Sequence, residues 1–160
     1  MIVVADTSVV LNLCRVRHEH LLPTLFGRIL IPTVVASEFV RLAGTDARFA
    51  GLSLPGWIEI LPSPPIPPTV SAANLDLGEA AAIALCLSQT ADALLVDESL
   101  GRAVAARLGL RTIGILGILL EARARGLIPK VAPVLDLLEL EAGFWIAPAL
   151  RLRVLQLADE

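Results

Sequence analysis

Four carboxylates of this 160-residue chain stand beside apolar residues. Asp6 and Asp97 each follow a short apolar run. Glu38 interrupts an apolar helical pattern, and Glu79 begins a helix whose next eight residues are all apolar. A carboxylate at the edge of a core costs free energy unless it is paired or bound to a metal. The only lysine, Lys130, comes late in the chain and cannot neutralise all four.

Such acids would suit a hard divalent cation with oxygen ligands. Mg²⁺ is typically held by one or two carboxylates, with water and substrate phosphate completing its coordination, and Mn²⁺ also fits oxygen ligands. The chemistry that follows is metal-assisted hydrolysis of a phosphodiester.

Each acid also has a purely structural explanation. Asp6 and Asp97 could cap helices. Glu79 could favour a helix N-terminus through the helix dipole, and Glu38 could simply face water.

Several competing catalytic motifs are absent from the chain. It has no P-loop, no GxGxxG and no GxSxG elbow. The segment Asp6-Thr7-Ser8 lacks the second aspartate of a DxD phosphatase. A phospho-receiver domain would need a lysine near Ile113–Leu116, where the sequence has none.

The composition favours a protein with a partner. Apolar residues make up 56% of the chain and charged residues 18%, which is more apolar and less charged than average. Surplus apolar surface usually lies in an interface, so we expect an oligomer or an obligate partner. The net charge of −3 does not indicate nucleic-acid binding. Several arginines do gather late in the sequence, although a solvated helix face explains them equally well: Arg102, Arg107, Arg111, Arg123 and Arg125.

Cysteine and histidine usage does not indicate a zinc site. Cys14 and Cys86 each lie in an apolar helical pattern without a CxxC or Cys/His spacing, so we expect both in the core. His18 and His20 have no third ligand nearby and are expected at the surface. Unpaired cysteines fit a reducing, cytoplasmic compartment. The longest apolar runs, such as Ala80–Leu87, are too short to span a membrane, and the N-terminus does not resemble a signal peptide.

The order of the expected elements predicts a single α/β domain over residues 1–160. Alternating strands and helices favour a three-layer α/β/α sandwich with a central, mainly parallel sheet. Thr7 or Ser8 is expected to cap the first helix, and Thr33 the third. The expected strands are 2–5, 28–31, 57–60 (an edge strand), 93–96 and 111–115. The expected helices are 9–15, 18–26, 33–42 (ended by Gly44), 78–89, 99–108, 116–125, 133–141 and one from Pro148, with the proline-rich 62–68 as a connector.

Because Asp6 and Asp97 each follow a buried strand, a parallel sheet would place both at one edge. Ligands of such sheets bind at the carboxyl ends of the strands.

Several segments, in this order, resemble one family. They are Val3-Val4-Ala5-Asp6-Thr7-Ser8, Ile31-Pro32 with Val34-Val35-x-x-Glu38, Leu77-Gly78-Glu79-Ala80, Leu94-Leu95-Val96-Asp97-Glu98, Gly101-Arg102 and Gly114-x-x-Gly117. Together they look like the PIN-domain ribonucleases, best known as the VapC-like toxins of toxin–antitoxin pairs. The Gly-Glu-Ala segment is similar to one subgroup, in which Glu79 stands where many relatives have aspartate. The resemblance covers about residues 1–128, and the tail 129–160 matches no motif.

This resemblance implies roles for particular residues. Asp6, Glu38, Glu79 and Asp97 would be the catalytic and metal-binding acids. Thr7 and Ser8 would lie beside the metal or a substrate phosphate. Glu98 replaces the second aspartate of a common Asp-Asp pair, and would be an acid outside the set that touches the metal.

The implied activity is a Mg²⁺- or Mn²⁺-dependent endoribonuclease that acts as a toxin. It would be homodimeric, with RNA as substrate and a small cognate antitoxin as inhibitor. Two alternatives remain open at this point. One is a PIN-like or other α/β module that binds nucleic acid or protein without cutting, and the other is a metallohydrolase of small molecules.

Overall fold

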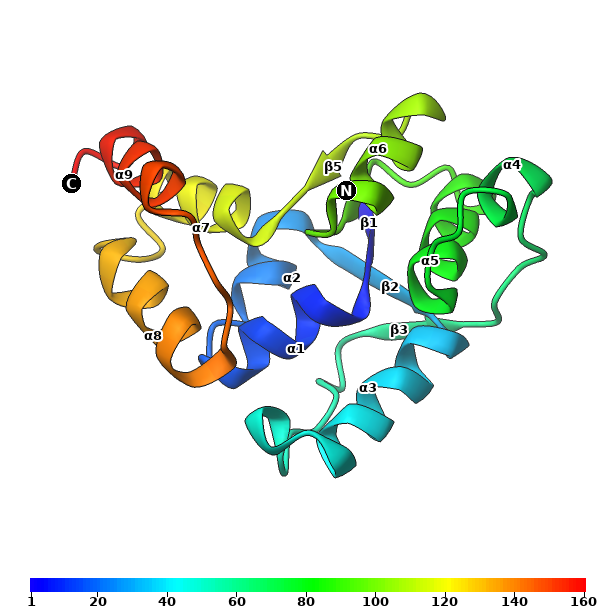
Figure 1. Cartoon of the computed structure of the whole chain (residues 1–160), viewed down its shortest axis with the longest axis horizontal. Helices are drawn as coiled ribbons and strands as arrows, with labels where there is room; N and C mark the ends of the chain where they lie inside the picture. The colour runs from blue at the N-terminus through cyan, green and yellow to red at the C-terminus, as the bar shows by residue number, and fades with distance from the viewer.

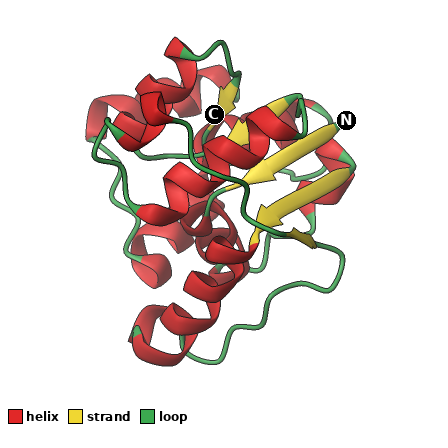
Figure 2. Ribbon diagram, turned by 90° about the vertical axis from the view of Figure 1, so that its right-hand side faces the viewer, coloured by secondary structure: helices red, strands yellow, loops and turns green.

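The central strand of the sheet is β1 (Ile2–Ala5), and its β-branched residues are buried on both faces. A computed structural model describes all residues, 1–160. It shows a five-stranded sheet in the order β3-β2-β1-β4-β5, in which every neighbouring pair is parallel. Helices cover the sheet (Figures 1 and 2). The predicted α/β/α sandwich is therefore confirmed, and its sheet is entirely parallel.

The other strands lie close to their expected positions. β3 is an edge strand, as predicted, and β5 forms the opposite edge. The bounds are β2 Arg28–Pro32, β3 Glu59–Leu61, β4 Ala93–Leu95 and β5 Thr112–Ile113.

The helices connect successive strands and also form the C-terminal part of the chain. α5, rich in alanine, packs across β1, β2 and β4. The bounds are α1 Thr7–Arg15, α2 Leu21–Phe26, α3 Thr33–Thr45, α4 Pro68–Ser71, α5 Leu77–Ser88, α6 Ser99–Arg107, α7 Ile115–Ala124, α8 Ala132–Ala142 and α9 Pro148–Leu157, with a 3₁₀ turn, η1, at Ala47–Phe49.

Two predicted helix caps are wrong. α1 begins at Thr7 itself, so Asp6 occupies the N-cap position, and its side chain makes no capping hydrogen bond. α3 likewise begins at Thr33, after Pro32. Both helices thus begin earlier than these caps would allow, so that Thr7, Ser8 and Thr33 lie inside them and cannot be their caps. Asp6 makes no capping hydrogen bond to α1, although the backbone N–H of Thr7 lowers the pKa of its carboxyl group.

Gly44 does not end α3, which continues to Thr45. The Thr45 hydroxyl donates a hydrogen bond of 2.8 Å to the carbonyl of Arg41, one turn earlier. Pro68, expected in an irregular connector, instead opens the short helix α4, because proline is well suited to the first turn of a helix.

One contiguous core holds the sheet and its covering helices together. Cys14 and Cys86 are both buried in it, as predicted. His20 is exposed, whereas His18 is half-buried, with its Nδ1 2.6 Å from the carbonyl oxygen of Val16. No helix has the length and apolar character needed to cross a membrane.

Candidate active site

Asp6 and Asp97 lie at the same edge of the sheet, as their positions after β1 and β4 predict. The two strands are adjacent and parallel, with Ala5 in register with Leu95. The backbone N–H of Asp6 donates a hydrogen bond of 2.9 Å to the Leu95 carbonyl, which extends the ladder to the acid itself. Asp6 is only 5% exposed. The buried, paired strands β1 and β4 thus fix the backbone positions of Asp6 and Asp97.

Asp97 does not cap the helix that follows it. Its Oδ1 accepts a hydrogen bond of 2.9 Å from the N–H of Ile115, the first residue of α7. Its Oδ2 is buried and has no hydrogen-bond partner. A Cβ at Gly114 would lie 2.7 Å from Oδ1, so the missing side chain there makes room for the carboxylate.

Glu79 lies in the first turn of α5 and is 5% exposed. A Cβ at Gly101, on α6, would lie 3.2 Å from its Oε2. The backbone N–H of Glu79 donates to Asp76 Oδ1 at 2.8 Å, so Asp76 is the cap of α5. Glu79 therefore contributes to the helix start through its backbone, and its carboxylate points to where α5 and α6 meet.

Glu38 reaches the same region from α3. It is half-buried, and its Oε2 would lie 2.8 Å from a Cβ at Gly78 in the first turn of α5. The alternative that Glu38 simply faces water is therefore incomplete, because its carboxylate lies against the start of another helix.

The electrostatics show that these acids share one environment. Burial raises the pKa of Asp6 from 3.8 to about 7, and the negative charges of Asp76, Glu38 and Asp97 add to the increase. None of the four predicted acids takes part in an ion pair. The protein thus concentrates negative charge here without a cation bonded to it.

Burial raises the pKa values of Glu79 and Asp97 as well. Burial raises the pKa of Glu79 from 4.5 to about 8, and Asp76, Asp6 and Glu98 contribute further. Burial also raises the pKa of Asp97, although the N–H of Ile115 and the nearby Arg102 partly offset this.

The donor set fits a hard cation by its chemistry, although the side chains do not form a closed metal site. No group of three or more His, Cys, Asp or Glu residues is arranged to hold a metal ion. The side chains offer only oxygen, which suits Mg²⁺ or Mn²⁺. Two buried oxygens, Asp97 Oδ2 and Thr7 Oγ1, lack partners, and such atoms are costly unless something binds them.

The remaining predicted site residues lie around this cluster. Thr7 is buried, and Ser8 is half-buried. Glu98 is exposed, and its charge contributes to the raised pKa of Glu79.

Sequence reasoning missed three residues of this region. Asp76 is the nearest additional acid, and its position three residues before Glu79 is a capping pattern that could have revealed it. Asn12 is buried on α1, one turn after Ser8. Arg102 is exposed, as expected for a solvated helix face, but it also lies next to Asp97.

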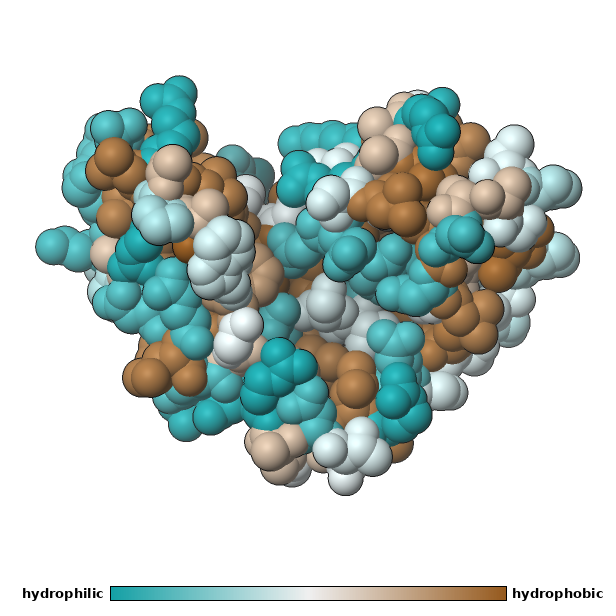
Figure 3. Space-filling view, viewed as in Figure 1, coloured by the Kyte–Doolittle hydropathy of each residue, from teal (hydrophilic) through white to brown (hydrophobic).

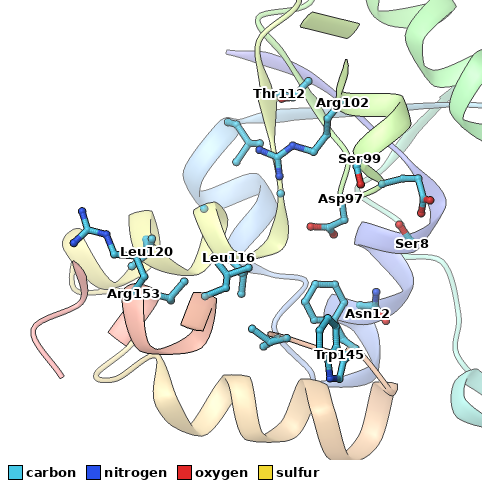
Figure 4. Close-up of a pocket in the computed structure, with 18 of the residues that line it drawn as sticks. Ser8, Asn12, Asp97, Ser99, Arg102, Thr112, Leu116, Leu120, Trp145 and Arg153 are labelled. Atoms are coloured by element: carbon cyan, nitrogen blue, oxygen red, sulfur yellow. The ribbon is translucent and has the colours of Figure 1, made fainter. Parts of the chain in front are cut away.

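A groove of about 850 Å³ opens beside the acids. Figure 3 shows the surface hollowed between the side that carries α7–α9 and the side that carries α6. Ser8, Asn12, Asp97 and Arg102 line one part of it (Figure 4). The C-terminal segment, including Trp145, lines the other.

An all-parallel sheet with a buried acid, Asp6, and a half-buried acid, Asp97, at the carboxyl ends of adjacent strands defines an α/β protein with a candidate hydrolytic site. Residues 2–160 match the family described as PIN domain, and the chain belongs to this family. The match includes the tail 129–160, to which no motif was assigned. No curated protein matches the chain. PIN domains are generally nucleases and typically use a divalent metal.

Proposed function

We propose that this PIN domain is a metal-dependent endoribonuclease that hydrolyses RNA phosphodiester bonds. The observation that carries the proposal is the pair of acids at the carboxyl ends of β1 and β4, the buried Asp6 and the half-buried Asp97, neither of which forms an ion pair. Raised pKa values at buried groups in a cleft are typical of functional sites. A structural role alone would not explain why Asp6 neither caps its helix nor forms an ion pair.

In this mechanism Asp6 and Asp97 would hold the cation, and Glu79 and Glu38 would supply the other carboxylates of the site. When bound, the divalent ion supplies Lewis-acid activation of water and offsets charge on the phosphate. Thr7 and Ser8 lie where they can donate hydrogen bonds to a phosphate oxygen. The half-buried Glu38 can accept a hydrogen bond from the attacking water and so orient it. Glu98 would affect the site through its charge, without contacting the cation.

The test is cleavage of single-stranded RNA by the purified protein with Mg²⁺ or Mn²⁺. We expect Asp6→Asn and Asp97→Asn each to abolish cleavage, because each removes a metal ligand while keeping the size of the side chain. The matched control is Asp159→Asn, since Asp159 is exposed and has a positive φ that asparagine tolerates. Cleavage that persists in both site variants after chelator controls would refute the proposal.

One observation favours a second function, a PIN-like module that binds RNA or protein without cutting it. The acids do not form a closed set of three metal ligands. This alternative predicts RNA capture that neither depends on metal nor leads to cleaved product.

We further propose that the protein is the toxin of a toxin–antitoxin pair and forms a homodimer. Half of the twelve exposed large apolar residues lie between Leu127 and Leu157, a distribution that fits a partner surface. The toxin role predicts a short neighbouring open reading frame with a DNA-binding N-terminus. It also predicts growth arrest when the protein is expressed alone, and relief when that neighbour is co-expressed.

A further inference from the structure

The groove beside the acids has walls of different character. Ser8 and Asp97 lie at its acidic side, and Leu116 and Leu120 of α7 give it an apolar lining. The segment between α8 and α9 contributes Trp145, and Figure 4 shows this side chain next to Asn12. A volume of about 850 Å³ falls within the range of ligand sites, roughly 300–1,000 Å³.

Trp145 is unusual because most of its side chain is exposed. It is 78% exposed, although a tryptophan buries more apolar area than almost any other residue when it packs inside a protein. The backbone on both sides of Trp145 is held in place. Phe144 N–H donates to the Leu138 carbonyl at 3.0 Å, and Ile146 is buried in the core. The ring is therefore displayed at the groove by an anchored segment.

Arg102 supplies a cation to the same groove. It forms no ion pair, and neither does Arg153, which also lines the groove. Arg102 lies near Asp97, whose pKa it lowers. A free guanidinium next to a phosphodiester-cleaving site is suited to a phosphate.

We propose that this groove is a subsite for single-stranded RNA, in which a base stacks on Trp145 and a neighbouring phosphate lies against Arg102. The proposal rests on the proposed function, because it takes the acids as the place where the strand is cut. Proteins that hold single strands commonly combine stacking aromatic residues with basic groups along the backbone. A peptide could also use the apolar lining, but it would not need both the free guanidinium groups of Arg102 and Arg153 and the acid site beside the groove.

The chain provides its own optical probe, because it has only two tryptophans, Trp57 and Trp145. Trp57 precedes β3, at the edge of the sheet opposite β5, and does not line the groove. In the Trp57→Phe variant, fluorescence reports on Trp145 alone. In the Trp145→Phe variant it reports on Trp57 alone.

The experiment is a titration of both variants with a mixed-sequence, single-stranded RNA decanucleotide in EDTA. We expect saturable quenching in the Trp57→Phe variant and none in Trp145→Phe. Binding of the fluorescein-labelled RNA, followed by anisotropy, should weaken by about 5- to 100-fold in Trp145→Ala, the range typical of one base–aromatic stack. Trp145→Phe, which keeps an aromatic ring, should recover most of that affinity.

Arg102 is tested by the salt dependence of the same binding. Arg102→Ala should reduce the slope of log affinity against log salt by about 1, as expected for one lost phosphate contact. Arg107→Ala is the matched control on the same helix, because Arg107 is exposed and does not line the groove. It should leave the slope unchanged.

These results separate this proposal from the proposed function, because EDTA removes the need for cleavage. Binding with Trp145 quenching but no metal-dependent cutting would support the subsite and refute the nuclease. RNA cleavage with unchanged Trp145 fluorescence, and with equal affinity in Trp145→Ala, would overturn the subsite alone. Absence of RNA binding at every concentration would also overturn it and would favour a peptide as the occupant of the groove.

Discussion

At the scale of single residues, Asp6 and Glu79 are held where their charged forms are unfavourable. Their pKa values in the folded chain, about 7 and about 8, lie well above the ordinary 3.8 and 4.5. At pH values between the ordinary and the raised pKa of each group, the folded chain binds more protons than the unfolded chain. Raising the pH through this window therefore lowers the free energy of unfolding.

We predict that, in EDTA, the Tm falls as the pH is raised from 5 to 8 and levels off above the higher pKa. Asp6→Asn and Glu79→Gln should each flatten this dependence, because neither amide titrates. Differential scanning fluorimetry from pH 5 to pH 9 tests this. A Tm that rises or stays constant in the parent protein would contradict the assignment. Mn²⁺ should raise the Tm more at pH 8 than at pH 5, since a cation binds the deprotonated carboxylates.

Asp76 has two effects that a pair of substitutions can separate. It caps α5 through the N–H of Glu79, and its charge raises the pKa values of Asp6 and Glu79. Asp76→Asn should retain the cap and, in EDTA at pH 8, be more stable than the parent protein, because one repelling charge is removed. Asp76→Ala should be less stable than Asp76→Asn by about 1 kcal/mol, the usual contribution of an N-cap. Urea denaturation measures both, and equal stability of the two variants would exclude the capping role.

At the scale of elements, the first turn of α5 is where α3, α5 and α6 bring their acids together. Two glycines allow this approach, because a side chain at Gly78 would meet Glu38 and one at Gly101 would meet Glu79. The same two glycines thus allow the helices to pack closely and leave space for the carboxylates of Glu38 and Glu79.

We predict that Gly78→Ala alters the site more than the stability. The new methyl group would lie 2.8 Å from Glu38 Oε2, the mobile end of a side chain, so the carboxylate should move while the helix remains. RNA cleavage should decrease several-fold with a small change in Tm. Gly44→Ala is the matched control, since it is also helical and a Cβ there meets nothing within 4 Å. It should keep full activity and gain about 0.5–1 kcal/mol of stability. Equal activity of the two variants would exclude the positioning role of Gly78.

At the scale of the whole molecule, the exposed apolar side chains gather in the C-terminal part of the chain. Leu140 on α8 and Leu152 on α9 are 83% and 59% exposed. α8 and α9 are held to each other by ion pairs of Arg151 with Asp136 and Glu139. The exposed apolar residues of these two helices are where we place the interface of the proposed homodimer.

We predict a solution mass of about twice the 16.9 kDa of one chain. Leu152→Glu should lower it to that of a single chain, because a charge in an apolar interface must lose its water. Light scattering after size-exclusion chromatography measures this, with Val40→Glu on the distant α3 as the control for an exposed apolar residue. A parent protein that is monomeric at high micromolar concentration would refute the homodimer.

The sequence predicted most of the fold, because its signals are local. Short β-branched runs bounded by turns gave the strands, and apolar periodicity gave the main helices. The errors lie at boundaries. The caps at Thr7 and Thr33 were wrong because both helices begin at these residues, and α4 was missed because four residues carry little periodicity.

The sequence by itself determined that Asp6 and Asp97 lie at one edge of the sheet, since each follows a buried strand and parallel strands end together. Only the tertiary structure decided that Glu38 and Asp76 approach them, because this depends on how α3 and α5 pack. It also brought Arg102 and the distant Trp145 to the same groove. Contacts between residues far apart in sequence are set by packing, and no local pattern encodes them. The four acids predicted from the sequence, together with Asp76, thus form a larger acidic region that borders a groove.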